Sequence, residues 1–261
     1  MKPKFVTISF IILGFVSLLS FFGHEAMAQS LTLDLGEGMP GAGGEVTGTG
    51  SVAGRVIQIV ALLTVLSLAP SILIMMTSFT RIIVVLSFVR TAMGVQQTPP
   101  NTVLVSLALF LTFFIMAPTL QSAYEKGVVP MMNGEISEME AFELSTGPFK
   151  EFMLKHVREK DLQLFMRLSE TPAVEEPMDI PIQVIIPSFM ISELQRAFEI
   201  GFMIFLPFLV IDMVTASILM SMGMMMLPPV MISLPFKIIF FVLVDGWYLI
   251  AGSLVESFMG R

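Results

Sequence analysis

The sequence predicts an all-α integral membrane protein, built from kinked helical hairpins with a small helical section outside the membrane. Three observations carry this prediction. Hydrophobic residues make up 55% of the 261-residue chain and charged residues only 13%, a balance typical of membrane proteins. Several apolar runs reach the length of about twenty residues that a spanning helix needs. Prolines and isolated charges interrupt these runs, which favours helices packed inside an oligomer over helices surrounded by lipid.

The N-terminus has the pattern of a signal peptide over residues 1–28. Basic residues precede an apolar stretch, which ends in the small-x-small sequence AMA. Cleavage is therefore expected between Ala28 and Gln29, and it would leave the mature N-terminus outside the cytoplasm. An uncleaved anchor is the alternative. Residues 29–51 are rich in glycine and predict a flexible extracytoplasmic lead-in.

Residues 52–120 predict a first helical hairpin. The run from Gly54 to Met76 would extend roughly 34 Å as a helix, enough to cross a bilayer, and the run from Thr102 to Leu120 carries no charge. Between them, TRIIVVLSFVR (Thr80–Arg90) is too short to span alone. Its two arginines, with no acid between them, place this segment on the cytoplasmic side.

Residues 121–187 predict an acidic helical section that faces water outside the cytoplasm. Twelve acidic and six basic residues lie between positions 121 and 179. Pro148 is expected to open a helix that runs through His156, because proline is favoured in a first turn. The prolines that follow predict an irregular chain over 170–187. His156 is expected on a solvated helical face, and a single histidine in a mature chain without cysteine predicts no metal site.

Residues 188–261 predict a second hairpin. Apolar runs from Phe202 to Leu227 and from Phe236 to Val255 flank a turn bounded by prolines, which break a helix. Asp212 lies in the first run and Lys237 in the second, at similar distances on either side of the turn. A hairpin brings the two to comparable depth, so they are a candidate buried ion pair, since charges within apolar helices face protein or an aqueous path.

The turn of this hairpin is rich in methionine, and Met224, Met225 and Met226 are consecutive. Unbranched thioether side chains adapt to irregular surfaces, which suits a seal that closes and reopens. Ordinary helix packing is the alternative interpretation of the same residues.

The helix that leads into the hairpin carries Glu193, Arg196 and Glu199 at three-residue spacing. This spacing places the three charges on one face of a helix. The stripe fits a solvated face, a subunit interface or the lining of a pore.

Charge asymmetry predicts four spanning helices, with both mature ends and the acidic section outside. The net charge of −7 argues against nucleic acid as a partner. The sequence holds no H-E-x-x-H, G-x-S-x-G or P-loop motif, so no enzymatic activity and no cofactor are expected. An ion or small-solute transporter that uses Asp212 is an alternative, although Lys237 would neutralise that carboxylate and no inverted repeat is visible.

Three long blocks resemble the FliP family of flagellar biosynthesis proteins, whose relatives serve in type III secretion. They are LSLAPSILIMMTSFTRIIVVLSFVR (Leu66–Arg90), FLVIDMVTASILMSMGMMMLPP (Phe208–Pro229) and SLPFKIIFFVLVDGW (Ser233–Trp247). The resemblance covers Val52 to Arg261, and the signal peptide with its glycine-rich lead-in resembles the flagellar branch rather than the virulence branch.

The resemblance implies a subunit of a flagellar export gate in the bacterial inner membrane, within the basal body. Family members form a pentamer that joins FliQ and FliR, meets FlhA and FlhB, and admits unfolded flagellar proteins. The helices assemble into a ring-like right-handed spiral lifted largely above the membrane plane. By resemblance, Met224, Met225 and Met226 correspond to the family's methionine gasket.

The resemblance also implies a buried charge network. The residues that match it here are Glu193, Asp212 and Lys237, and Lys237 is expected to pair with either acid, within or between subunits.

Overall fold

The structure is a computed structural model that describes residues 49–95, 98–170, 176–224 and 228–260. The signal peptide, its cleavage site at Ala28 and Gln29, and almost all of the glycine-rich lead-in lie outside these residues. The chain divides after Gly54 into two units, and the contacts discussed below all belong to the second, Arg55–Arg261. The described residues form helices and turns with no strand among them, which confirms the all-α prediction.

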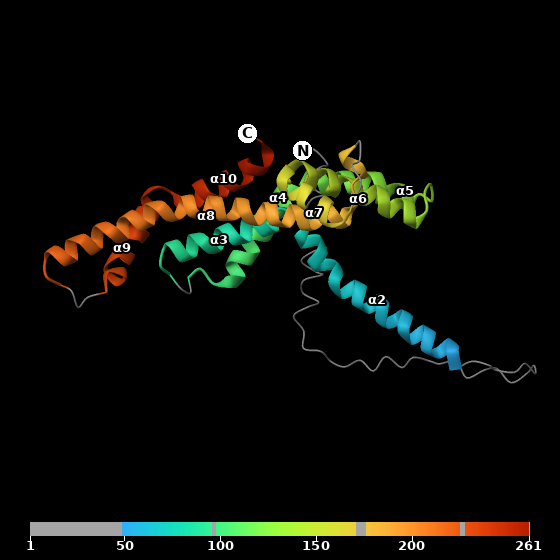
Figure 1. Cartoon of the computed structure of the whole chain (residues 1–261), viewed down its shortest axis with the longest axis horizontal. Helices are drawn as coiled ribbons and strands as arrows, with labels where there is room; N and C mark the ends of the chain where they lie inside the picture. Colours follow the sequence, from blue (N-terminus) through green and yellow to red (C-terminus); the bar gives the residue numbers. More distant parts are fainter. Residues whose placement is uncertain (1–48, 96–97, 171–175, 225–227, 261) are drawn as a thin grey trace, which may run out of the picture. The chain divides into compact units, whose positions relative to one another are not determined.

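The helices follow one another along the chain (Figure 1) in the order α2 (Thr49–Met75), α3 (Phe79–Ala92), α4 (Asn101–Ala123), α5 (Val129–Met132), α6 (Glu138–His156), α7 (Glu159–Leu168), α8 (Ile182–Ser221), α9 (Pro229–Leu243) and α10 (Gly246–Met259). A π-helical turn (Tyr124–Val128) joins α4 to α5, and a 3₁₀ turn (Pro177–Asp179) precedes α8.

Two proline-based expectations in the acidic section are wrong. Pro148 lies inside α6 rather than at its start, because Ser137 provides a better N-terminus: its hydroxyl accepts the backbone N–H of Glu140 at 3.3 Å, as an N-cap residue does. The chain also becomes regular before Pro187, since α8 begins at Ile182 and contains that proline. Pro187 is the sixth residue of α8, beyond the first turn, so the 40-residue helix tolerates there the loss of one backbone donor.

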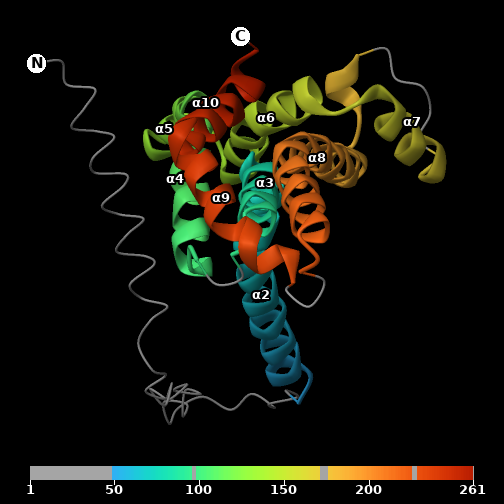
Figure 2. The same cartoon turned by 90° about the vertical axis from the view of Figure 1, so that its left-hand side faces the viewer.

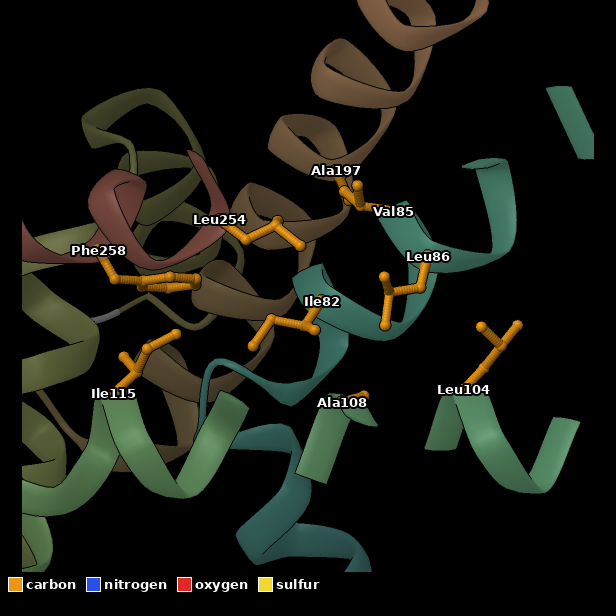
Figure 3. Packing of buried hydrophobic residues seen from close by; sticks show 9 residues of the cluster. All are labelled: Ile82, Val85, Leu86, Leu104, Ala108, Ile115, Ala197, Leu254 and Phe258. Atoms are coloured by element: carbon orange, nitrogen blue, oxygen red, sulfur yellow. The ribbon is translucent and has the colours of Figure 1, made fainter. Parts of the chain in front are cut away.

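Helix α3 lies between α4 and α8, as Figure 2 shows. Its buried side chains contribute to a core that α4, α8 and α10 complete (Figure 3), made of Ile82, Val85, Leu86, Leu104, Ala108, Ile115, Ala197, Leu254 and Phe258. α3 and α8 approach closely at Gly201, where an added Cβ would lie 2.5 Å from the ring of Phe88. A larger residue at position 201 would therefore push the two helices apart.

Two helical stretches of the described chain are long and apolar enough to cross a membrane, Asn101–Met132 and Ile182–Ser221. The sequence predicts four spans, one of them from the run Phe236–Val255. The structure divides this run between α9 and α10, which are bent by 61° where they meet. Counted as one broken span, this pair would be the third.

Candidate functional site

Asp212 and Lys237 form an ion pair between α8 and α9. Lys237 Nζ donates to Asp212 Oδ2 at 2.6 Å and to the backbone carbonyl of Ala92 at 3.2 Å. Ser233, one turn before Lys237 on α9, donates its hydroxyl to Asp212 Oδ1 at 2.6 Å. The Lys237 side chain is 5% exposed and that of Asp212 30% exposed. Both carboxylate oxygens therefore have a partner, one of them cationic.

This pair connects three helices rather than two. Ala92 is the last residue of α3, and its carbonyl has no helical partner of its own because the last four carbonyls of a helix are unpaired. A cation at that position also interacts favourably with the helix dipole. Lys237 thus fastens the hairpin of α8 and α9 to the C-terminal end of α3.

Glu193 does not join Asp212 and Lys237, and its partner is Arg81 on α3. Arg81 Nε donates to Glu193 Oε2 at 2.8 Å and Nη2 to Oε1 at 2.5 Å, the two-pronged geometry that makes arginine–carboxylate pairs strong. The side chains are 1% and 0% exposed. The third nitrogen of Arg81, Nη1, donates to Ser257 at 2.9 Å, and the guanidinium lies 3.7 Å from the centre of the Phe258 ring.

Sequence reasoning missed Arg81 because its segment was interpreted only as a short cytoplasmic stretch. The signal was present: an arginine in a run of β-branched and apolar residues needs an acid, and charges are rarely buried unpaired. The expected charged stripe also divides. Glu193 is buried, Arg196 is half-buried, and Glu199 is exposed and accepts from Gln195 Nε2 at 2.9 Å.

His156 is not on a solvated face, and that expectation is wrong. It is buried at the end of α6 between the rings of Phe152 and Phe258. Its Nδ1 lies 2.8 Å from the Phe152 carbonyl and its Nε2 lies 3.2 Å from that of Phe258. Burial lowers the pKa of His156 below its usual 6.5. The described part of the chain holds no group of three or more side chains able to bind a metal ion.

A second polar cluster fixes the acidic section to α8. Asp161, buried at the start of α7, lies with its Oδ2 2.7 Å from the hydroxyl of Ser192 and accepts Arg158 Nε at 2.7 Å. The Ser192 hydroxyl in turn accepts the backbone N–H of Arg158 at 3.0 Å. Because Ser192 precedes Glu193, adjacent residues of α8 contact α7 and α3.

Replacing Asp161 with alanine is expected to lower the free energy of unfolding at neutral pH by about 1.5–3 kcal/mol, the usual contribution of hydrogen bonds to a charged group. Burial raises the pKa of Asp161, but the hydrogen bonds from Ser192 and Arg158 outweigh it, and the net pKa lies below 3.8. The stabilisation is therefore present above the unfolded-state pKa and is lost as the pH falls through the folded-state value.

Denaturant unfolding of both proteins in detergent from pH 7 to pH 3 measures this difference. The gap between wild type and Asp161→Ala should narrow towards acid pH. A gap that stays constant would show that Asp161 acts through packing alone.

The methionine-bearing end of the hairpin is partly described. Met224 is exposed, whereas Met225 and Met226 lie outside the described residues, as does Leu227. Other exposed methionines of this end are Met220, Met222 and Met231. α8 ends at Ser221, earlier than the apolar run predicts, because Gly223 adopts a positive φ of 73° that ends the helix.

In its described residues the chain is all-helical, with two or three apolar stretches long enough to cross a membrane, charges paired between its helices and apolar side chains exposed on its surface. Residues 62–254 match the model of the FliP family. Proteins named flagellar biosynthetic protein FliP are 60% identical in Caulobacter vibrioides (89% of this chain and 84% of the relative) and 61% identical in Bacillus subtilis (77% and 91%). The relative from Aquifex aeolicus is 52% identical (77% and 85%).

The chain belongs to the FliP family. It is accordingly a flagellar biosynthesis protein with apolar helices suited to a membrane.

Proposed function

We propose that this chain is a core subunit of the flagellar type III protein export gate. Copies of it form the entrance channel through which unfolded flagellar proteins leave the cell for the growing flagellum. The assembly is a pentamer-like ring or spiral with FliQ and FliR in the inner membrane, within the flagellar basal body, and it meets FlhA and FlhB. The mature N-terminus and the acidic section, which extends from residue 121 to 187, face the periplasm. Membership of the FliP family supports this proposal.

The length of α8 supports assembly with other subunits. Its 40 residues extend about 60 Å, twice the roughly 30 Å of the apolar layer of a bilayer. Large apolar side chains are exposed along much of this length, among them Phe198, Phe202 and Met213. Lipid can cover only part of such a helix, so neighbouring protein chains must cover the rest.

The observation that carries the gate proposal is the methionine-bearing end of the hairpin. A closed pore must block ions and still admit polypeptides of varied sequence. Methionine side chains can repack around such chains, as they do on promiscuous binding surfaces. Both helices contribute exposed methionines to this end: Met222 directly follows α8, and Met231 lies in the first turn of α9.

The alternative of an ion transporter that uses Asp212 gains no support from the geometry. A transport carboxylate must exchange its proton or cation, but both oxygens of Asp212 already have partners, and the ammonium of Lys237 balances the charge.

Replacing Met224, Met225 and Met226 with alanine is expected to leave the oligomer intact and to raise the leak of small ions across the inner membrane several-fold, because the shorter side chains leave the constriction open. Ion flux in cells that express each variant measures the leak, and native mass spectrometry measures the oligomer. The matched control replaces three methionines of the acidic section, Met131, Met132 and Met139. An unchanged leak from an intact oligomer would contradict the gasket.

A further inference from the structure

The junction of α9 and α10 is a sharp elbow with a charged residue at its corner. Asp245 adopts the left-handed conformation (φ 52°, ψ 52°), which is rare and unfavourable for residues other than glycine, asparagine and aspartate. It precedes α10, but its carboxylate makes no capping hydrogen bond. Among the described residues, no ion pair or side-chain hydrogen bond involves Asp245.

Some residues of the elbow are closely packed and others are exposed. An added Cβ at Gly246 would lie 2.3 Å from the ring of Phe241, on which Trp247 packs edge to face. By contrast, Leu243 is 79% exposed and Tyr248 is 74% exposed. The corner therefore presents a bare carboxylate within a surface of large, uncovered apolar side chains.

The helices on either side of Asp245 determine what this surface needs. Apolar helices of 15 and 14 residues precede and follow the elbow, so Asp245 lies about 20 Å along the chain from the far end of either helix. Once this surface is covered, a short carboxylate side chain cannot reach water over that distance, unlike lysine or arginine, whose long side chains extend towards it. A charge held in an apolar layer is strongly unfavourable unless an opposite charge meets it.

We propose that the elbow is a docking surface for an apolar helix of a neighbouring subunit that carries a lysine or arginine to pair with Asp245. The unpaired carboxylate requires a lysine or arginine on the docked helix. The exposed Leu243 and Tyr248 require that the rest of that helix be apolar. A lipid headgroup fits less well, because the exposed Leu243 and Tyr248 beside Asp245 need an apolar partner as well as a charged one. This inference rests on the proposed function only in requiring neighbouring subunits.

The first test places a photo-reactive amino acid at Leu243 in the full chain, expressed in its own inner membrane with its partner proteins. Mass spectrometry then identifies the cross-linked peptide. We expect an apolar segment of a membrane protein that contains a lysine or arginine. Cross-links to lipid alone, or to a peptide without a basic residue, would overturn the proposal.

The second test changes the charge. Asp245→Asn keeps a residue that tolerates the left-handed conformation, and it should lower the cross-link yield about tenfold or more, as loss of a buried charge pair does at other interfaces. Asp245→Lys should abolish the cross-link, and changing the partner's basic residue to aspartate should restore it. Glu256→Lys, at an exposed acid of α10, is the matched control and should change nothing.

The outcomes separate this inference from the proposed function. If Asp245→Lys leaves both the complex and flagellar export unchanged, the elbow is not a docking surface, and the export-gate function stands. If the wild-type chain forms no complex with other membrane proteins, the proposed function itself fails.

Discussion

Arg81→Met is expected to lower the free energy of unfolding by about 3–5 kcal/mol, the cost of removing one partner of a buried ion pair. Glu193 is fully buried between α3 and α8, so the variant leaves a carboxylate without its cation and without two hydrogen bonds. Methionine retains most of the volume of the arginine stem, so the loss comes mainly from the unpaired charge rather than from a cavity.

Chemical unfolding of the purified chain in detergent measures this effect. Arg167→Met is the matched control, because Arg167 is exposed on α7 and no buried acid depends on it. The double variant Arg81→Met with Glu193→Leu should recover most of the lost stability, since removing both charges removes the desolvation cost. An Arg81→Met protein as stable as Arg167→Met would show that the pair contributes little.

Lys237→Met is expected to lower the free energy of unfolding by about 1–3 kcal/mol and to impair assembly and swimming. Asp212 loses its cation and the Ala92 carbonyl loses its donor, so a buried acceptor at the end of α3 has no partner. The cost is smaller than at Arg81 because Asp212 is 30% exposed and solvent or a neighbour can compensate in part.

Swimming-plate assays, together with recovery of the intact membrane complex, measure the consequence of Lys237→Met. Lys126→Met, at an exposed position of the acidic section, is the control for loss of a lysine. Wild-type swimming by the Lys237 variant would remove this ion pair from the mechanism.

Much of the fold could be predicted from hydropathy, because long apolar runs leave the backbone only the helix as a conformation within a membrane. The proximity of Asp212 and Lys237 followed from the same reasoning, since a hairpin aligns residues at similar distances from its turn. The pairing of Arg81 with Glu193 could not be predicted in this way. Their helices are far apart in sequence, and only the packing of α3 on α8 brings them together.

The errors have local physical causes. Pro148 indicated a helix start, but the helix begins earlier in the structure, at Glu138, after the N-cap residue Ser137. The elbow at Asp245 was hidden in an apolar run, although the Asp-Gly dipeptide is itself a turn signal. His156 was assigned to solvent from its charged neighbours, whereas the two phenylalanine rings that bury it come from one turn earlier in α6 and from α10.

Helices α3 and α8 are fastened to each other at two separate points. Arg81 contacts Glu193 directly, and Lys237 joins the end of α3 to Asp212. The two anchor points on α8 lie 19 residues apart, about 28 Å along the helix. Two separate contacts prevent α8 from sliding along α3 and from rotating against it. Between the two ion pairs, α3 and the part of α8 from Glu193 to Asp212 are therefore held in a single register.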